Sequence, residues 1–115
     1  MRIKVYLTRT CTTSRRAVEY LKSKDVEVEE IDYYKNKLTK DGIAKLLKLA
    51  DVSPRDALRK KDKMYKEMNL ARKKISDDEI LILMEKYPGL INRPIVVRGT
   101  KAVIARETSK RDALF

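Results

Sequence analysis

The first third of the chain changes its hydrophobic period twice. Residues 3–7 place an apolar side chain at every second position, which predicts a buried β-strand. From Ser14 the apolar residues recur at spacings of three and four, which predicts a helix whose buried side carries Ala17, Val18 and Leu21. A second strand is predicted where apolar and acidic residues alternate, at Val26, Val28 and Ile31. A strand, a helix and a strand within about thirty residues form a βαβ unit, whose two strands are parallel.

The middle of the chain is predicted to be helical. One apolar stripe at helical spacing comprises Leu38, Ile43, Leu46, Leu47 and Ala50. Ser53 followed by Pro54 predicts a helix start, because serine is a favoured N-cap and proline is tolerated in the first turn. Ser76 and Glu79 have the spacing of a capping box before a further helix, which Pro88-Gly89 ends.

The last apolar runs predict a β-hairpin. Residues 95–97 and 102–105 are small or β-branched, and the four residues between them suit a turn. No repeat, low-complexity linker or domain boundary divides the sequence. We therefore predict one α/β domain over residues 1–115, with a small mixed β-sheet flanked by helices.

The charge balance narrows the choice of partner. Lys and Arg number 28 and Asp and Glu 17, a formal net charge of +11. That excess favours nucleic acid, a membrane surface or a small oxyanion, although it also serves solubility alone. No stretch approaches the ~20 apolar residues of a membrane span, so we expect a cytoplasmic protein with no membrane contact. The basic residues of 60–74 alternate with apolar ones, which indicates a solvated helix face and does not favour direct nucleic-acid binding.

Histidine is absent and cysteine occurs once, which restricts the chemistry. Catalysis by histidine is excluded, and no metal site is expected because transition metals usually draw on these ligands. No bound cofactor is expected either. A single cysteine excludes an internal disulfide and agrees with a reducing compartment.

Cys11 is the strongest candidate for a reactive group. It lies between the first predicted strand and the first predicted helix, where unpaired N–H groups and the helix dipole lower the pKa of a thiol. Ser14 can donate a hydrogen bond to the sulfur, and Arg15 adds positive charge. Free cysteines are often small buried hydrophobes, but the neighbours of Cys11 are polar and basic. The pattern therefore predicts a reactive thiolate.

Pro94 opens the strand predicted at residue 95. Proline lacks the N–H that a sheet ladder needs and is tolerated at the first position of a strand. Pro94 is also a candidate for a cis peptide bond after Arg93. Alone, this pair is typical of an ordinary turn with an exposed arginine.

Taken together and in order, these motifs resemble the glutaredoxin-coupled arsenate reductases and their relatives. The resemblance extends from Lys4 to about Arg106. It is carried by four stretches, Cys11-Thr12-Thr13-Ser14-Arg15, Arg55-Asp56-Ala57-Leu58-Arg59, Tyr65-Lys66-Glu67-Met68-Asn69-Leu70 and Asn92-Arg93-Pro94-Ile95-Val96-Val97. It implies a thioredoxin-like fold for the whole domain.

The resemblance also implies a reaction. In that family a nucleophilic cysteine is assisted by three arginines that hold an oxyanion; Cys11 matches the nucleophile, and Arg59, Arg93 and Arg106 match the arginines. The implied step is attack of the thiolate on arsenic in arsenate or a similar oxyanion. Because the chain has no second cysteine, an external thiol must complete the cycle. The resemblance implies glutathione as co-substrate, followed by glutaredoxin.

Two alternatives remain open on the sequence. Spx-type regulators share the fold and the arginine-proline strand start, and they bind RNA polymerase without catalytic turnover. Typical members use two cysteines three residues apart as a disulfide switch, and Ser14 occupies the second place here. That exchange removes the intramolecular switch but not the binding. The other alternative is a glutathione-linked thiol enzyme with a different substrate.

Overall fold

The structure, a computed structural model, describes residues 2–8, 11–24 and 26–105. These residues fall into two compact units. One contains the described residues of Met1–Asn36 and Arg93–Phe115, and the other is Lys37–Asn92. The prediction of a single domain over the whole chain stays a prediction.

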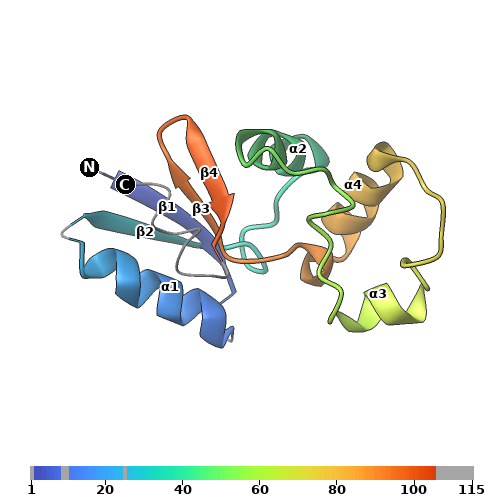
Figure 1. Cartoon of the computed structure of the whole chain (residues 1–115), viewed down its shortest axis with the longest axis horizontal. Helices are drawn as coiled ribbons and strands as arrows, with labels where there is room; N and C mark the ends of the chain where they lie inside the picture. The colour runs from blue at the N-terminus through green and yellow to red at the C-terminus, as the bar shows by residue number, and fades with distance from the viewer. Residues whose placement is uncertain (1, 9–10, 25, 106–115) are drawn as a thin grey trace. The chain divides into compact units, whose positions relative to one another are not determined.

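The first unit is built on a four-stranded mixed sheet with the strand order β2-β1-β3-β4 (Figure 1). β1 (Arg2–Leu7) is parallel to β2 (Glu27–Asp32) and antiparallel to β3 (Ile95–Arg98). β3 in turn pairs antiparallel with β4 (Lys101–Ile104). The predicted parallel pair, the C-terminal hairpin and the mixed sheet are therefore confirmed.

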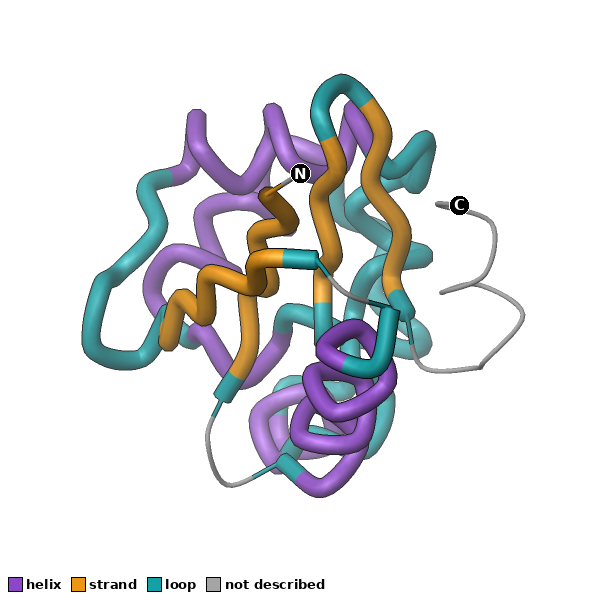
Figure 2. Tube along the Cα trace, turned by 90° about the vertical axis from the view of Figure 1, so that its left-hand side faces the viewer, coloured by secondary structure: helices purple, strands orange, loops and turns teal. Residues whose placement is uncertain are grey.

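A helix between β1 and β2 supplies the other half of the core of this unit. α1 spans Thr12–Lys22 and buries the apolar side that the sequence predicted. The buried cluster comprises Ile3, Val5, Leu7, Val18, Leu21, Val96 and Ala105. Burying one side chain of this size stabilises a fold by about 1.5–3 kcal/mol, so the sheet and α1 are held together mainly by this cluster. Figure 2 shows the strands side by side in orange.

The turn of the hairpin depends on one glycine. Gly99 has a φ of 60°, in the left-handed region that side chains with a Cβ rarely adopt. The chain therefore reverses between β3 and β4 without backbone strain, at the position that the sequence predicted.

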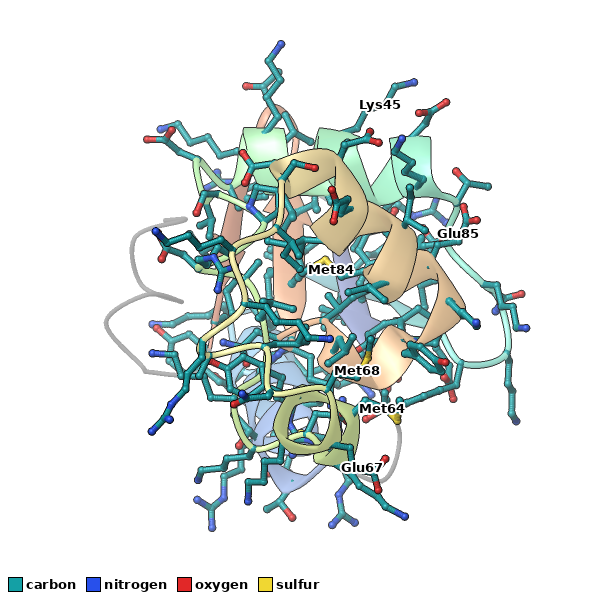
Figure 3. The ribbon with its side chains drawn as sticks, turned by 90° about the vertical axis from the view of Figure 1, so that its right-hand side faces the viewer. Lys45, Met64, Glu67, Met68, Met84 and Glu85 are labelled. Atoms are coloured by element: carbon teal, nitrogen blue, oxygen red, sulfur yellow. The ribbon has the colours of Figure 1, made fainter. Side chains whose placement is uncertain are left out.

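The second unit is helical and contains α2 (Lys40–Leu49), α3 (Lys63–Glu67), α4 (Asp77–Lys86) and the short 3₁₀-helix η1 (Pro88–Leu90). α2 and α4 pack together, and their fully buried side chains include Ile43, Leu47, Ile80 and Met84. Figure 3 shows Met84 inside this unit and Lys45 at its periphery. Within the described ranges, no helix has the length and apolar character to cross a membrane.

The start of α4 confirms the predicted N-cap. The hydroxyl oxygen of Ser76 accepts a hydrogen bond from the backbone N–H of Glu79 at 3.2 Å. This bond satisfies one of the N–H groups that a helix start leaves without a partner. The helix then ends at Lys86, just before Pro88.

The helix start predicted at Ser53 is wrong. The Ser53 hydroxyl accepts from the N–H of Asp56 at 3.2 Å, as an N-cap does, but residues 54–57 form turns. Leu58 then pairs with Ile91 in an isolated β-bridge. That tertiary pairing straightens the backbone where a helix would have continued, so the local capping signal starts only a turn.

Candidate active site

Cys11 is the N-cap residue of α1, as the sequence predicted. Its backbone is extended, with φ −84° and ψ 117°. Its N–H donates to the carbonyl of Thr8 at 3.2 Å, and its carbonyl accepts from the N–H of Arg15 at 3.1 Å. Both ends of the residue are thereby fixed at the positive end of the helix dipole.

Ser14 holds the sulfur of Cys11 from the first turn of the same helix. Its side chain is fully buried, with 0% of its surface exposed. Both its hydroxyl and its backbone N–H lower the pKa of Cys11 through polar contacts. Among the described residues the hydroxyl makes no hydrogen bond of standard geometry. Ser14 is therefore left to donate to a thiolate.

Arg93, which is far from Cys11 in the sequence, also contacts its sulfur. Its side chain is 7% exposed, and its guanidinium hydrogen-bonds Cys11. The peptide bond between Arg93 and Pro94 is cis. The antiparallel pairing of Tyr6 in β1 with Ile95 in β3 sets the start of β3, just after Arg93 and Pro94, beside the end of β1. The sheet thus brings Arg93 to Cys11.

These contacts set the acidity of the thiol. Burial of Cys11 is the largest single influence and raises its pKa, but the hydrogen bonds from Ser14 and the hydrogen bond and charge of Arg93 outweigh it. The pKa of Cys11 falls from its ordinary value of 9.0 to about 7. At neutral pH about half of the thiol is therefore ionised.

Two tyrosines that the sequence analysis did not single out complete this site. Tyr33 is 1% exposed and hydrogen-bonds Arg93, while its burial raises its pKa to about 12. The ring of Tyr34 stacks on that of Tyr33, with centroids 5.5 Å apart. The guanidinium carbon of Arg93 lies 5.9 Å from the centroid of the Tyr34 ring.

A sequence signal for these tyrosines did exist. They follow the second predicted strand directly, and parallel neighbouring strands end at the same edge of a sheet. Leu7 is opposite Asp32 in the register of β1 and β2, and the N–H of Tyr33 donates to the carbonyl of Leu7 at 3.3 Å. The residue just after β2 therefore lies beside the end of β1, which precedes Cys11 in the sequence.

The other predicted site residues are Arg15, Arg59 and Arg106. Arg15 is exposed on α1, and the guanidinium that lowers the pKa of Cys11 is that of Arg93. Arg59 belongs to the unit Lys37–Asn92, where its Nη1 lies 4.0 Å from a carboxylate oxygen of Asp62. Arg106 lies outside the described residues. The roles of Arg59 and Arg106 stay predictions.

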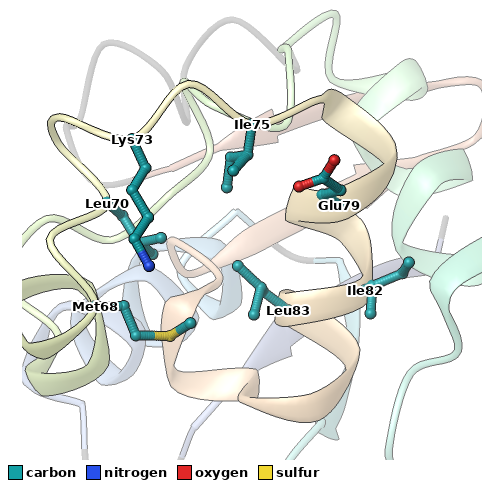
Figure 4. Close-up of a pocket in the computed structure, with 7 residues that line it drawn as sticks. All are labelled: Met68, Leu70, Lys73, Ile75, Glu79, Ile82 and Leu83. Carbon is teal, nitrogen blue, oxygen red and sulfur yellow. The ribbon is translucent and has the colours of Figure 1, made fainter.

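A separate pocket lies within the unit Lys37–Asn92. It has a volume of about 310 Å³ and is lined by Met68, Leu70, Lys73, Ile75, Glu79, Ile82 and Leu83 (Figure 4). One lysine and one glutamate are its only charged lining residues, and none of the predicted site residues lines it. The candidate chemistry therefore belongs to the site around Cys11.

A cysteine of lowered pKa at the first helix of a thioredoxin-like sheet, with an arginine before a cis-proline beside it, defines a thiol-dependent protein of the thioredoxin-like class. The model of the ArsC family matches residues 6–113. The chain therefore belongs to the ArsC family.

Known proteins agree with this assignment. The arsenate reductase of Escherichia coli K12 is 38% identical over 95 residues, which are 83% of this chain and 67% of that protein. The uncharacterized protein YfgD of the same organism is 35% identical over 105 residues, 90% of this chain and 88% of that protein. A solved structure of an arsenate reductase from Vibrio cholerae superposes with a TM-score of 0.92 at 27% identity, covering 100% of this chain and 98% of that one. The resemblance to arsenate reductases and the thioredoxin-like fold are confirmed.

Proposed function

We propose that the protein is a thiol-dependent arsenate reductase in which Cys11 is the nucleophile. The observation that carries this proposal is the sulfur of Cys11, which is held by Ser14 and Arg93 with a pKa of about 7. Nucleophilic attack requires the thiolate, and these contacts supply it at neutral pH. Relatives named arsenate reductases support arsenate as the electrophile.

The reaction balances with two thiols. The Cys11 thiolate attacks arsenic(V) and forms a sulfur–arsenic bond, and one arsenate oxygen takes up protons and leaves as water. A second thiol, from glutathione or glutaredoxin, then supplies the other sulfur. Two electrons pass to arsenic, which leaves as arsenite, and the two sulfurs end as a disulfide. Arsenate and two thiols thus give arsenite, one disulfide and water.

Arginine suits the substrate of this reaction. The planar guanidinium offers paired N–H donors to a tetrahedral oxyanion, which a lysine ammonium does not. In this proposal Arg93 holds arsenate oxygens next to the sulfur, and Arg59 and Arg106 take the remaining negative charge, as the family resemblance implies. Charge that builds up on the oxygens during attack is then neutralised where it develops.

A coupled assay tests the proposal. Arsenate-dependent NADPH oxidation is followed with glutathione, glutathione reductase and glutaredoxin, for the wild type and for Cys11→Ser. We expect turnover by the wild type and none by Cys11→Ser. Ser23→Ala, at the exposed far end of α1, is the matched control and should retain activity. Turnover by Cys11→Ser, or none by the wild type with any thiol donor, contradicts the proposal.

A second candidate is an Spx-type regulator that binds RNA polymerase. The observation that favours it is a run of exposed basic side chains, Lys60, Lys61, Lys63, Lys66, Arg72, Lys73 and Lys74. Such a run fits an acidic protein surface. Capture of polymerase by the purified protein, together with no arsenate turnover, would favour this function over the reductase.

A further inference from the structure

We propose that Tyr33 is a positioning residue of the thiolate site, whose buried hydroxyl holds the Arg93 guanidinium toward Cys11 while that guanidinium rests over the ring of Tyr34. This inference rests on the proposed function, because it concerns the same site. It assigns roles to two side chains outside the set that the family resemblance implied.

Both tyrosines are themselves firmly anchored. The backbone of Tyr33 is tied to the end of β1 by its hydrogen bond to Leu7, and its ring is buried. The backbone N–H of Tyr34 donates to a carboxylate oxygen of Asp32 at 3.0 Å, which fixes the turn after β2. A tyrosine has few rotatable bonds, so an anchored backbone and a packed ring leave its hydroxyl little freedom.

Arg93 contacts both tyrosines, each in a different way. The Tyr33 hydroxyl accepts a hydrogen bond from the guanidinium, and the guanidinium carbon lies over the Tyr34 ring, 5.9 Å from its centroid. A guanidinium is planar with five N–H donors in fixed directions. The hydrogen bond to Tyr33 and the contact with the Tyr34 ring therefore restrict where the remaining donors point, and one of them reaches Cys11.

The choice of a phenol has an electrostatic consequence. Burial raises the pKa of Tyr33 to about 12, so the hydroxyl stays neutral wherever Cys11 is titrated. A carboxylate in its place would hold Arg93 equally firmly but would cancel its charge. A neutral anchor leaves the full positive charge of Arg93 for the Cys11 thiolate and for the oxygens of a bound oxyanion.

The test is the pH dependence of Cys11 alkylation by iodoacetamide, with no arsenate present. For Tyr33→Phe, which removes only the hydroxyl, we expect the midpoint to rise above that of the wild type. The rate at pH 7 should fall about three- to fivefold as the thiolate fraction decreases. Protection of Cys11 by sulfate, an arsenate mimic, should weaken as well. Tyr20→Phe is the matched control, because Tyr20 faces Lys24 on α1 and should leave the midpoint unchanged.

A double variant separates positioning from general damage. If Tyr33 acts through Arg93, the effect of Tyr33→Phe on the midpoint should disappear in an Arg93→Lys background. Equal midpoints for Tyr33→Phe and the wild type, or an undiminished shift in that background, would overturn the proposal. Should Tyr33→Phe fail to fold, Tyr34→Leu removes the half-exposed ring that is the second contact of Arg93, and an unchanged midpoint there overturns the positioning of Arg93 by these tyrosines. Since alkylation needs no arsenate, loss of the proposed reductase activity would not affect this result.

Discussion

The hydroxyl of Ser14 lies against the sulfur of Cys11 in the first turn of α1 and lowers the pKa of that thiol. Ser14 stands where a two-cysteine redox motif has its second thiol. A hydroxyl there cannot form a disulfide, but it stabilises the thiolate in place. The positions that hold two thiols in a redox motif therefore hold one thiol and one hydroxyl here, which suits a single nucleophile.

Replacing Ser14 with alanine should make Cys11 less acidic. The change removes the hydroxyl donor and keeps the backbone N–H contact, so part of the stabilisation remains. A hydrogen bond to a charged group is worth about 1.5–3 kcal/mol, so we expect the pKa of Cys11 to rise by about one to two units. Alkylation rates measured across pH check this value. Ser23→Ala serves as the control, and an unchanged midpoint in Ser14→Ala would show that the hydroxyl does not act on the sulfur.

Arg93→Lys should impair arsenate reduction while keeping a positive charge. Lysine offers no planar pair of donors, so we expect kcat/KM for arsenate to fall at least about tenfold, with kcat reduced as well as KM raised. Steady-state kinetics in the coupled assay measure this change. Arg2→Lys, on an exposed arginine of β1, is the matched control. Equal kcat and KM values for Arg93→Lys and the wild type would show that the Arg93 guanidinium is not needed for arsenate reduction.

Folding stability should depend on pH through Cys11. Its pKa is lower in the folded state than its ordinary value, so ionisation favours the folded chain. The contribution is complete above the unfolded pKa near 9.0 and is lost as the pH falls through the folded value of about 7. We therefore expect the free energy of unfolding of the wild type, relative to that of Cys11→Ser, to increase from about pH 6.5 to about pH 9. This range contains both the folded and the unfolded pKa of Cys11. Urea titrations across that range measure it, and a difference that stays flat would contradict the lowered pKa.

The cap of α4 offers a test of stability away from the site. Ser76→Ala removes the acceptor for the N–H of Glu79 and should lower the free energy of unfolding by about 1 kcal/mol. Ser76→Asp supplies another good cap and should retain most of that stability. Urea unfolding compares the three proteins. If alanine and aspartate have the same effect, the capping bond contributes little.

Features that depend on neighbours in the sequence could be predicted, and features that depend on strand register could not. The alternation of residues 3–7 and the spacing of Cys11 and Ser14 are local, so β1 and the start of α1 followed from the sequence alone. The contact of Tyr33 with Arg93 joins two segments that meet only when β2 and β3 flank β1. The order of the predicted strands indicates that Tyr33 lies near the end of β1, but nothing in either segment identifies Arg93 as its partner.

The error at Ser53 has the same origin. Its hydroxyl makes the bond of an N-cap, so the local signal was real. The pairing of Leu58 with Ile91 decides instead what the backbone does next. Sequence periodicity contains no information about that partner, because it lies more than thirty positions further along the chain.

The lowered pKa of Cys11 also bears on the last step of a thiol cycle. In thiol–disulfide exchange the departing sulfur leaves faster when its own thiol is more acidic, and an attacking thiol performs best when its pKa is near the ambient pH. With a pKa of about 7, Cys11 meets both conditions. The contacts that make Cys11 a nucleophile therefore also make it a good leaving group, so we expect an external thiol that attacks the other sulfur of a mixed disulfide at Cys11 to release the free thiolate readily.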